Sequence, residues 1–113
     1  MALDTVQDYV TQGRVLLQDT VEVYRFTNAN FLAGLNQALL ESRRVRPDLW
    51  IDTSVPSFST VDATAVAFDE QYRSALLFYM CGYVQLIDAE ETQDARAVVF
   101  LGKFTSILTG LTA

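Results

Sequence analysis

The sequence predicts an all-α protein, a small four-helix bundle with a long extended or hairpin-like loop between its second and third helices. Apolar residues recur at helical spacing in four separate stretches. One of these stretches has both of its ends encoded, by a capping threonine and a terminating proline. A segment rich in β-branched and hydroxyl residues, 48–68, separates the second stretch from the third. With 113 residues, the chain is expected to form a single domain over 1–113.

The first helix is expected over residues 4–18. Asp4 is its expected N-cap, because Gln7 follows three residues later at the spacing of a capping box. In the connector that follows this helix, Asp19 and Arg25 are expected to form a partly exposed ion pair that contributes little to stability.

The second helix is expected over residues 27–46. Thr27 is a good N-cap, and Phe26 and Phe31 stand at the two positions of a hydrophobic staple. Pro47 disfavours helical backbone at the residue before it and therefore ends the helix. The last turn is expected to hold three cations that suit the negative end of the helix dipole, Arg43, Arg44 and Arg46.

Asn36 lies beside the apolar face of this second helix. A buried amide needs hydrogen-bond partners. We therefore interpret Asn36 as a structural pin, and the backbone of the connector before the helix is its expected partner.

The loop 48–68 has two interpretations. Its apolar residues either pack back onto the core or form an arm that grips a neighbouring subunit, because aromatic anchors dominate interfaces. In the second case, Trp50→Ala is expected to spare the helix content of the monomer and to weaken partner binding. The expected partner-binding residues are Leu49, Trp50, Ile51, Phe58, Arg43, Arg44 and Arg46.

The third and fourth helices are expected over 69–88 and 92–111. The third is apolar almost all the way round, which is typical of a central helix, and Cys81 is expected to be one of its small buried residues. The fourth has one strongly apolar face and a second, milder face that is expected to contact another subunit. That second face consists of Ala95, Val98, Val99 and Gly102.

Composition argues against catalysis. The chain has no histidine, so the commonest general base and a common metal ligand are both absent. The acidic run that includes Asp88 and Asp94 lacks the spacing of a calcium loop and is better explained as helix capping. We expect no enzymatic activity, no metal and no cofactor.

Charge and hydropathy limit the partners. The chain has 14 acidic and 8 basic residues, a net charge of -6, which argues against a generic duplex-binding surface. The uncharged stretch Ser74–Ile87 is too short for a bilayer span, which takes about 20 residues, and the sequence opens with no export signal. No membrane association is expected, and the single cysteine is consistent with a reducing compartment.

Several motifs occur in an order that is familiar from one protein family. They are Val15-Leu16-Leu17-Gln18-Asp19-Thr20, Arg25-Phe26-Thr27, Leu32 with Leu35-Asn36-Gln37-Ala38-Leu39, Arg46-Pro47-Asp48-Leu49, Phe68-Asp69 with Tyr72, Ala75-Leu76 and Tyr79, Asp88-Ala89-Glu90, and Ala95-Arg96-Ala97 with Phe100 and Phe104. In these stretches the chain resembles the adaptor, or head-completion, proteins of tailed bacteriophages. These are the small head-to-tail connector subunits that bind below the portal.

The resemblance implies a homo-oligomeric ring of about twelve subunits, a dodecamer, around the DNA channel. Such a ring would bind the portal protein on one side and a tail nozzle or tail-tube protein on the other. It would sit in the neck of the virion, after assembly in the host bacterial cytoplasm.

An acidic wall would let double-stranded DNA pass without sequence-specific contact, because it repels the phosphate backbone. The expected lumen-facing acids are Glu90, Glu91 and Asp94. The alternative is a small helical protein-binding or regulatory module that forms no ring.

Overall fold

The computed structural model describes residues 3–20, 26–51, 54–87 and 91–110, without the side chains of residue 87 and residues 91–96. These ranges contain four α-helices, two short 3₁₀ helices and no strand, which confirms the all-α prediction. The elements are α1 (Val6–Leu16), α2 (Asn28–Val45), η1 (Pro47–Trp50), η2 (Glu70–Tyr72), α3 (Arg73–Ile87) and α4 (Glu91–Thr109).

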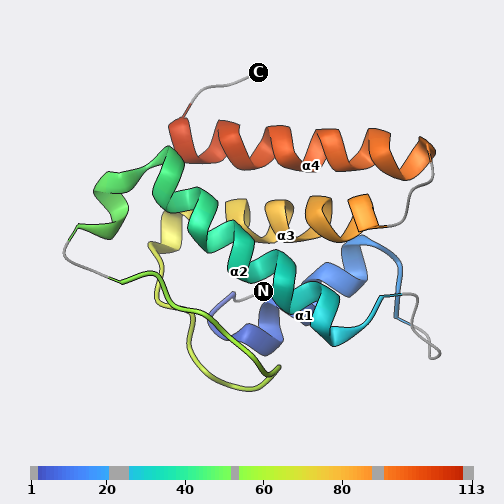
Figure 1. Cartoon of the computed structure of the whole chain (residues 1–113), viewed down its shortest axis with the longest axis horizontal. Coiled ribbons are helices and arrows are strands. Elements are labelled where there is room, and N and C mark those ends of the chain that lie inside the picture. Colours follow the sequence, from blue (N-terminus) through green and yellow to red (C-terminus); the bar gives the residue numbers. More distant parts are fainter. Residues whose placement is uncertain (1–2, 21–25, 52–53, 88–90, 111–113) are drawn as a thin grey trace.

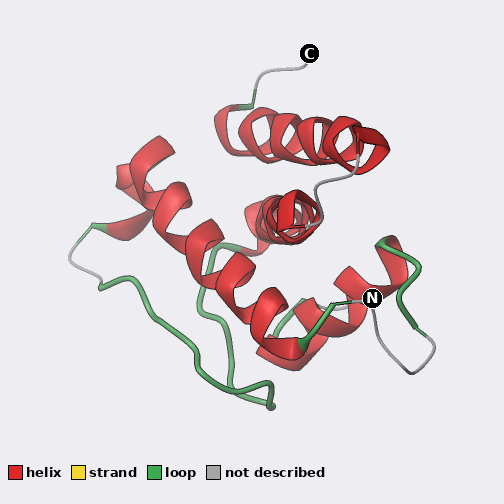
Figure 2. Cartoon of the chain, turned by 45° about the vertical axis from the view of Figure 1, so that its right-hand side comes forward, coloured by secondary structure: helices red, strands yellow, loops and turns green. Residues whose placement is uncertain are grey.

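α3 is the central helix. It lies between α4 on one side and α1 and α2 on the other (Figures 1 and 2). Its side chains Leu76, Met80 and Val84 are completely buried, and so is Cys81. The prediction of a central third helix with a buried cysteine is therefore confirmed.

Two glycines set how closely the neighbouring helices approach α3. A Cβ at Gly34 of α2 would lie 3.0 Å from the Met80 carbonyl oxygen, and one at Gly82 of α3 would lie 3.2 Å from the Ala97 carbonyl oxygen. Tyr79 of α3 meets Phe104 of α4 edge to face, with 4.8 Å between ring centroids. The core is thus packed on both sides of α3.

The start of α1 differs from the prediction by one residue. Thr5, and not Asp4, is the N-cap: its hydroxyl accepts from the Asp8 amide at 3.2 Å, and the Asp8 carboxylate accepts from the Thr5 amide at 3.1 Å. The backbone amides of Thr5 and Asp4, which both donate to the Asp8 carboxylate at 3.1 Å, hold the pKa of Asp8 below its usual value. Asp4 instead accepts a hydrogen bond from Arg73 at the start of α3.

The end of α1 comes earlier than the predicted residue 18. Gln18 adopts a left-handed backbone with φ 57°, and the Asp19 amide donates back to the Arg14 carbonyl at 2.8 Å. This is the hydrogen-bond pattern of a Schellman motif, which ends a helix. Glycine usually occupies the left-handed position because it lacks a Cβ. Because this position is a glutamine, the sequence did not indicate that the helix ends here.

Asp19 is buried and pairs with Arg14, which corrects the expectation that Asp19 is partly exposed, while its expected pair with Arg25 involves a residue that the structure does not describe. Its Oδ2 accepts from Arg14 Nη1 at 2.9 Å and from the Phe26 amide at 3.0 Å. Only 7% of Asp19 is exposed. Arg25 lies outside the described residues.

The boundaries of α2 agree closely with the prediction. The Thr27 hydroxyl accepts from the Asn30 amide at 3.2 Å, and the C-cap is Arg46. The Phe26 and Phe31 rings meet edge to face, with centroids 6.3 Å apart, so the hydrophobic staple is also confirmed.

A non-helical segment, residues 54–68, returns across α1 and α2 before η2 begins, and we call it the strap. An isolated antiparallel bridge joins it to the residue before α1. The Val6 amide donates to the Thr64 carbonyl and the Gln7 amide to the Asp62 carbonyl, both at 3.0 Å. The strap therefore supplies acceptors that the first turn of α1 lacks within its own helix.

Asn36 pins the middle of the strap to α2. Its Nδ2 donates to the Phe58 carbonyl and its Oδ1 accepts from the Phe58 amide, both at 2.8 Å. The prediction of a structural pin is confirmed, but its partner is the strap and not the connector before α2. The Asn36 side chain therefore bonds both the amide and the carbonyl of Phe58, the two backbone groups that a neighbouring β-strand would bond in a sheet.

We expect Asn36→Ala to destabilise the fold by about 1–3 kcal/mol, because the amide and carbonyl of Phe58 both lose their partner in a partly buried site. Urea denaturation measures this change. Gln37→Ala is the matched control, since Gln37 is the next residue of α2, is also partly buried and forms no hydrogen bond with its side chain within the described chain. Equal losses for the two variants would contradict the role of Asn36.

Candidate assembly surfaces

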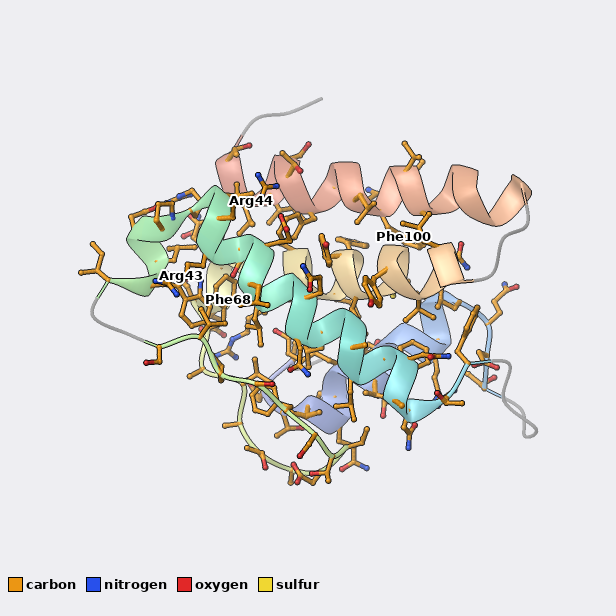
Figure 3. All side chains as sticks on the ribbon, in the orientation of Figure 1. Arg43, Arg44, Phe68 and Phe100 are labelled. Carbon is orange, nitrogen blue, oxygen red and sulfur yellow. The ribbon has the colours of Figure 1, made fainter. Side chains whose placement is uncertain are left out.

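The C-terminal half of α2 presents an exposed patch that we call the α2 patch, made of Leu40, Arg43 and Arg44. Leu40 is 52% exposed. Both arginines are exposed near the end of the helix (Figure 3). Arg44 Nε donates to Glu41 at 2.7 Å, but the Arg44 side chain is 73% exposed, so this pair is weak. The α2 patch therefore offers a partner two cations beside one apolar side chain, and binding by Arg43 and Arg44 stays a prediction.

Arg46 is engaged within the chain, and partner binding by Arg46 stays a prediction. Its Nε and Nη2 donate to the two carboxylate oxygens of Asp48 at 2.9 and 2.8 Å, and its Nη1 donates to the Leu108 carbonyl. Its guanidinium carbon also lies 5.3 Å from the Tyr72 ring centroid. The bond to Asp48 raises the pKa of Arg46 and lowers that of Asp48. Arg46 thus ties the end of α2 to the end of α4.

Trp50 is a core residue, and its assignment as a partner anchor is corrected. Only 6% of it is exposed. Its ring stacks on Phe68 with 5.6 Å between centroids, and its Nε1 donates to the Ser42 hydroxyl at 3.0 Å. Figure 3 shows Phe68 beneath the end of α2. The indole is bound on its face and on its polar edge by its own chain, so it is not available to a neighbour.

The other three apolar candidates around the strap divide into two groups. Leu49 and Phe58 are partly buried and pack against the core, which is the other interpretation of this segment. Ile51 is 69% exposed. Of the four apolar residues proposed for the arm, Ile51 alone is largely exposed to a partner.

The outer face of α4 is exposed. Val98 and Val99 are 68% and 57% exposed, and a Cβ built at Gly102 would meet no atom within 4 Å. Leu86 of α3 is 48% exposed. The inner face of α4 is packed instead: Phe100 stacks on Phe78, with centroids 6.0 Å apart (Figure 3). Of the second apolar face predicted from the sequence, Val98, Val99 and Gly102 are therefore left uncovered by the rest of the described chain, and the side chain of Ala95 lies outside the described set.

Sequence reasoning missed one buried charge, Arg14. Its Nη1 donates to Asp19 and to the Phe26 carbonyl, both at 2.9 Å, and its Nη2 donates to Asn28 Oδ1 at 2.8 Å. Its guanidinium carbon lies 4.8 Å from the Phe31 ring centroid. The available signal was a cation one residue after Gly13, on the apolar face of the first helix.

The three acids expected to face a DNA channel have no described side chain. Glu90 lies outside the described residues, and Glu91 and Asp94 belong to α4 with side chains outside the described set. Among the side chains that are described, no three His, Cys, Asp or Glu residues gather as metal ligands would. No helix within the described ranges has the length and apolar character to cross a bilayer.

Comparison with protein-family models, with curated proteins and with solved structures finds no match. Its function is therefore inferred from the exposed surfaces of this chain and from the motifs that resemble those of the phage adaptors. The surfaces are the α2 patch, Ile51 and the outer face of α4.

Proposed function

We propose that this chain is a structural subunit of a phage head-to-tail connector. It assembles as a ring beneath the portal, joins the portal to the tail and surrounds the DNA channel. The observation that carries the proposal is the exposed outer face of α4. Val98, Val99 and Gly102 form an apolar helix face with no cover within the described chain, and such a face is best explained by contact with another chain.

The positions of the exposed surfaces favour a ring over a two-fold dimer. The α2 patch and the outer face of α4 lie on different helices and differ in chemistry, one cationic and the other uncharged (Figure 3). A head-to-tail contact joins two different surfaces and closes into a ring when the rotation between subunits permits. The motifs shared with the phage adaptors favour the same assembly.

The mass of the chain in solution tests this proposal. We would measure it by size exclusion with light scattering, for the chain alone and co-expressed with the portal protein of its own genome. A stoichiometric complex of a ring on the portal is the expected result. A chain that stays monomeric beside an intact portal ring would support the alternative, a small protein-binding or regulatory module.

Val98→Glu locates the interface. A charge at this exposed position is expected to leave the helical circular dichroism signal unchanged and to abolish the portal complex, because a buried unpaired carboxylate is costly. Ala63→Glu adds the same charge to an exposed position of the strap, and it is expected to keep the complex. Loss of the complex in both variants would contradict a contact specific to α4.

A further inference from the structure

The outer face of α4 and the α2 patch are complementary in shape. A Cβ built at Gly102 would meet no atom of the described chain within 4 Å, and the neighbouring Val98 and Val99 are both exposed. Among the described residues of α2, Leu40 is the one large apolar side chain that is exposed. Packed helices insert large side chains of one helix between residues spaced three and four apart on the other. Leu40 therefore has the size and the exposure to fill the space that Gly102 leaves open.

The charges beside these two surfaces are opposite in sign. Arg43 and Arg44 are exposed in the α2 patch. Glu91 and Asp94 stand in the first turn of α4, seven and four residues before Val98 in the sequence. Opposite charges that face each other across an interface attract, whereas two copies of the α2 patch placed face to face would repel. Charge therefore favours a contact between the α2 patch and α4 over a contact of the α2 patch with its own copy.

The spacing along the two helices fixes the direction of this contact. Arg44 lies four residues beyond Leu40, toward the C-terminus of α2. Asp94 lies four residues before Val98, toward the N-terminus of α4. At about 1.5 Å per residue, both separations are about 6 Å along the helix. The apolar and the charged contacts therefore form together only if the two helices run antiparallel, which also places the negative end of the α2 dipole beside the positive end of α4.

We propose that the α2 patch of one subunit packs antiparallel against the outer face of α4 of the next subunit, with Leu40 opposite Val98. This inference rests on the proposed ring and names the two surfaces that form it. The helices α2 and α4 lie on different sides of α3 (Figures 1 and 2), so one subunit has a surface for each of its two neighbours. It assigns Glu91 and Asp94 to the contact between subunits, where they face the arginines, instead of to the DNA channel.

Disulfide cross-linking between two variants tests this contact. A tagged Leu40→Cys chain is mixed with an untagged Val98→Cys chain, assembled with the portal protein and oxidised. Because a disulfide needs Cα atoms within about 7 Å, we expect linked dimers that contain one chain of each kind, and none from either variant alone. The native Cys81 is buried and present in every chain, so the wild-type assembly is the control.

The same experiment separates this contact from the ring itself. A ring on the portal without mixed dimers would overturn the contact and leave the proposed function standing, whereas a wild-type chain that forms no portal complex would overturn both. Linked dimers from Val98→Cys alone would mean that α4 packs against its own copy, and would overturn the contact. Thr105→Cys lies about 10 Å further along the exposed side of α4. It is expected to link to Leu40→Cys about tenfold less than Val98→Cys does, and an equal yield would overturn the assigned register.

Charge reversal tests the charged part of the contact without new cysteines. Arg43→Glu combined with Arg44→Glu is expected to weaken ring assembly about tenfold or more, because it places like charges opposite each other. Addition of Glu91→Lys and Asp94→Lys to the same chain restores the attraction and is expected to recover most of the assembly. Circular dichroism checks that each variant is folded. An unchanged ring after the first reversal, or no recovery in the combined variant, would overturn the assigned pairing of charges.

Discussion

Trp50→Ala is expected to destabilise the folded monomer by about 3–5 kcal/mol, the usual cost of removing a buried aromatic side chain. The substitution leaves a cavity between Phe68 and α2, and it removes the donor that the Ser42 hydroxyl accepts from. Because proteins of this size are stable by only about 5–15 kcal/mol, the loss would be visible as a large shift of the urea midpoint.

Ile51→Ala is the matched control for this variant. Ile51 is the next residue in the chain, but it is 69% exposed, whereas Trp50 is 6% exposed. We expect its effect on the free energy of unfolding to stay within about 0.5 kcal/mol. If Trp50→Ala also changed stability by no more than this and instead weakened portal binding, Trp50 would be an interface anchor after all.

Asp19→Ala is expected to cost about 3–5 kcal/mol, because it takes the Asp19 carboxylate away from the buried Arg14 guanidinium. Asp19 also accepts from the Phe26 amide at 3.0 Å, and this bond holds the residue before the N-cap of α2. The substitution therefore removes a charge partner and a backbone acceptor together. Thermal or urea unfolding, followed by circular dichroism, measures the loss.

An exposed ion pair provides the comparison. Glu41→Ala breaks the pair with Arg44, whose side chain is 73% exposed, and is expected to cost no more than about 1 kcal/mol. Arg14→Met combined with Asp19→Leu removes both buried charges, and is expected to be less destabilising than Asp19→Ala alone. A double variant that is as unstable as the sum of its single changes would show that the two residues act independently.

The parts of the fold that could be predicted from the sequence are those with local causes. α2 is the clearest example, because Thr27 accepts from an amide three residues away and Pro47 acts on the residue beside it. The central position of α3 was also predictable, since a helix that is apolar all the way round must be covered on several sides. The apolar second face of α4 followed from the same periodicity.

The parts that could not be predicted depend on distant partners or on unusual backbone. Gln18 ends α1 in a left-handed conformation that glycine would have signalled. Asn36 was identified as a pin, but its partner lies 22 positions further along the chain, and no local pattern specifies such a pairing. Trp50 is of a residue type that often anchors interfaces, and it is its burial, its contact with Phe68 and its hydrogen bond to Ser42 that place it in the core.

The strap also bears on the order in which the chain acquires its structure during synthesis. The amides of Val6 and Gln7 donate to the carbonyls of Thr64 and Asp62. Because Thr64 and Asp62 follow α2 in the chain, the ribosome adds them only after α2 has been synthesised. The nascent α1 therefore emerges with an incomplete first turn, and a short helix of this kind is marginal alone in water. Closing so long a loop carries an entropic cost, and α1 reaches its final structure only once the strap has returned to it.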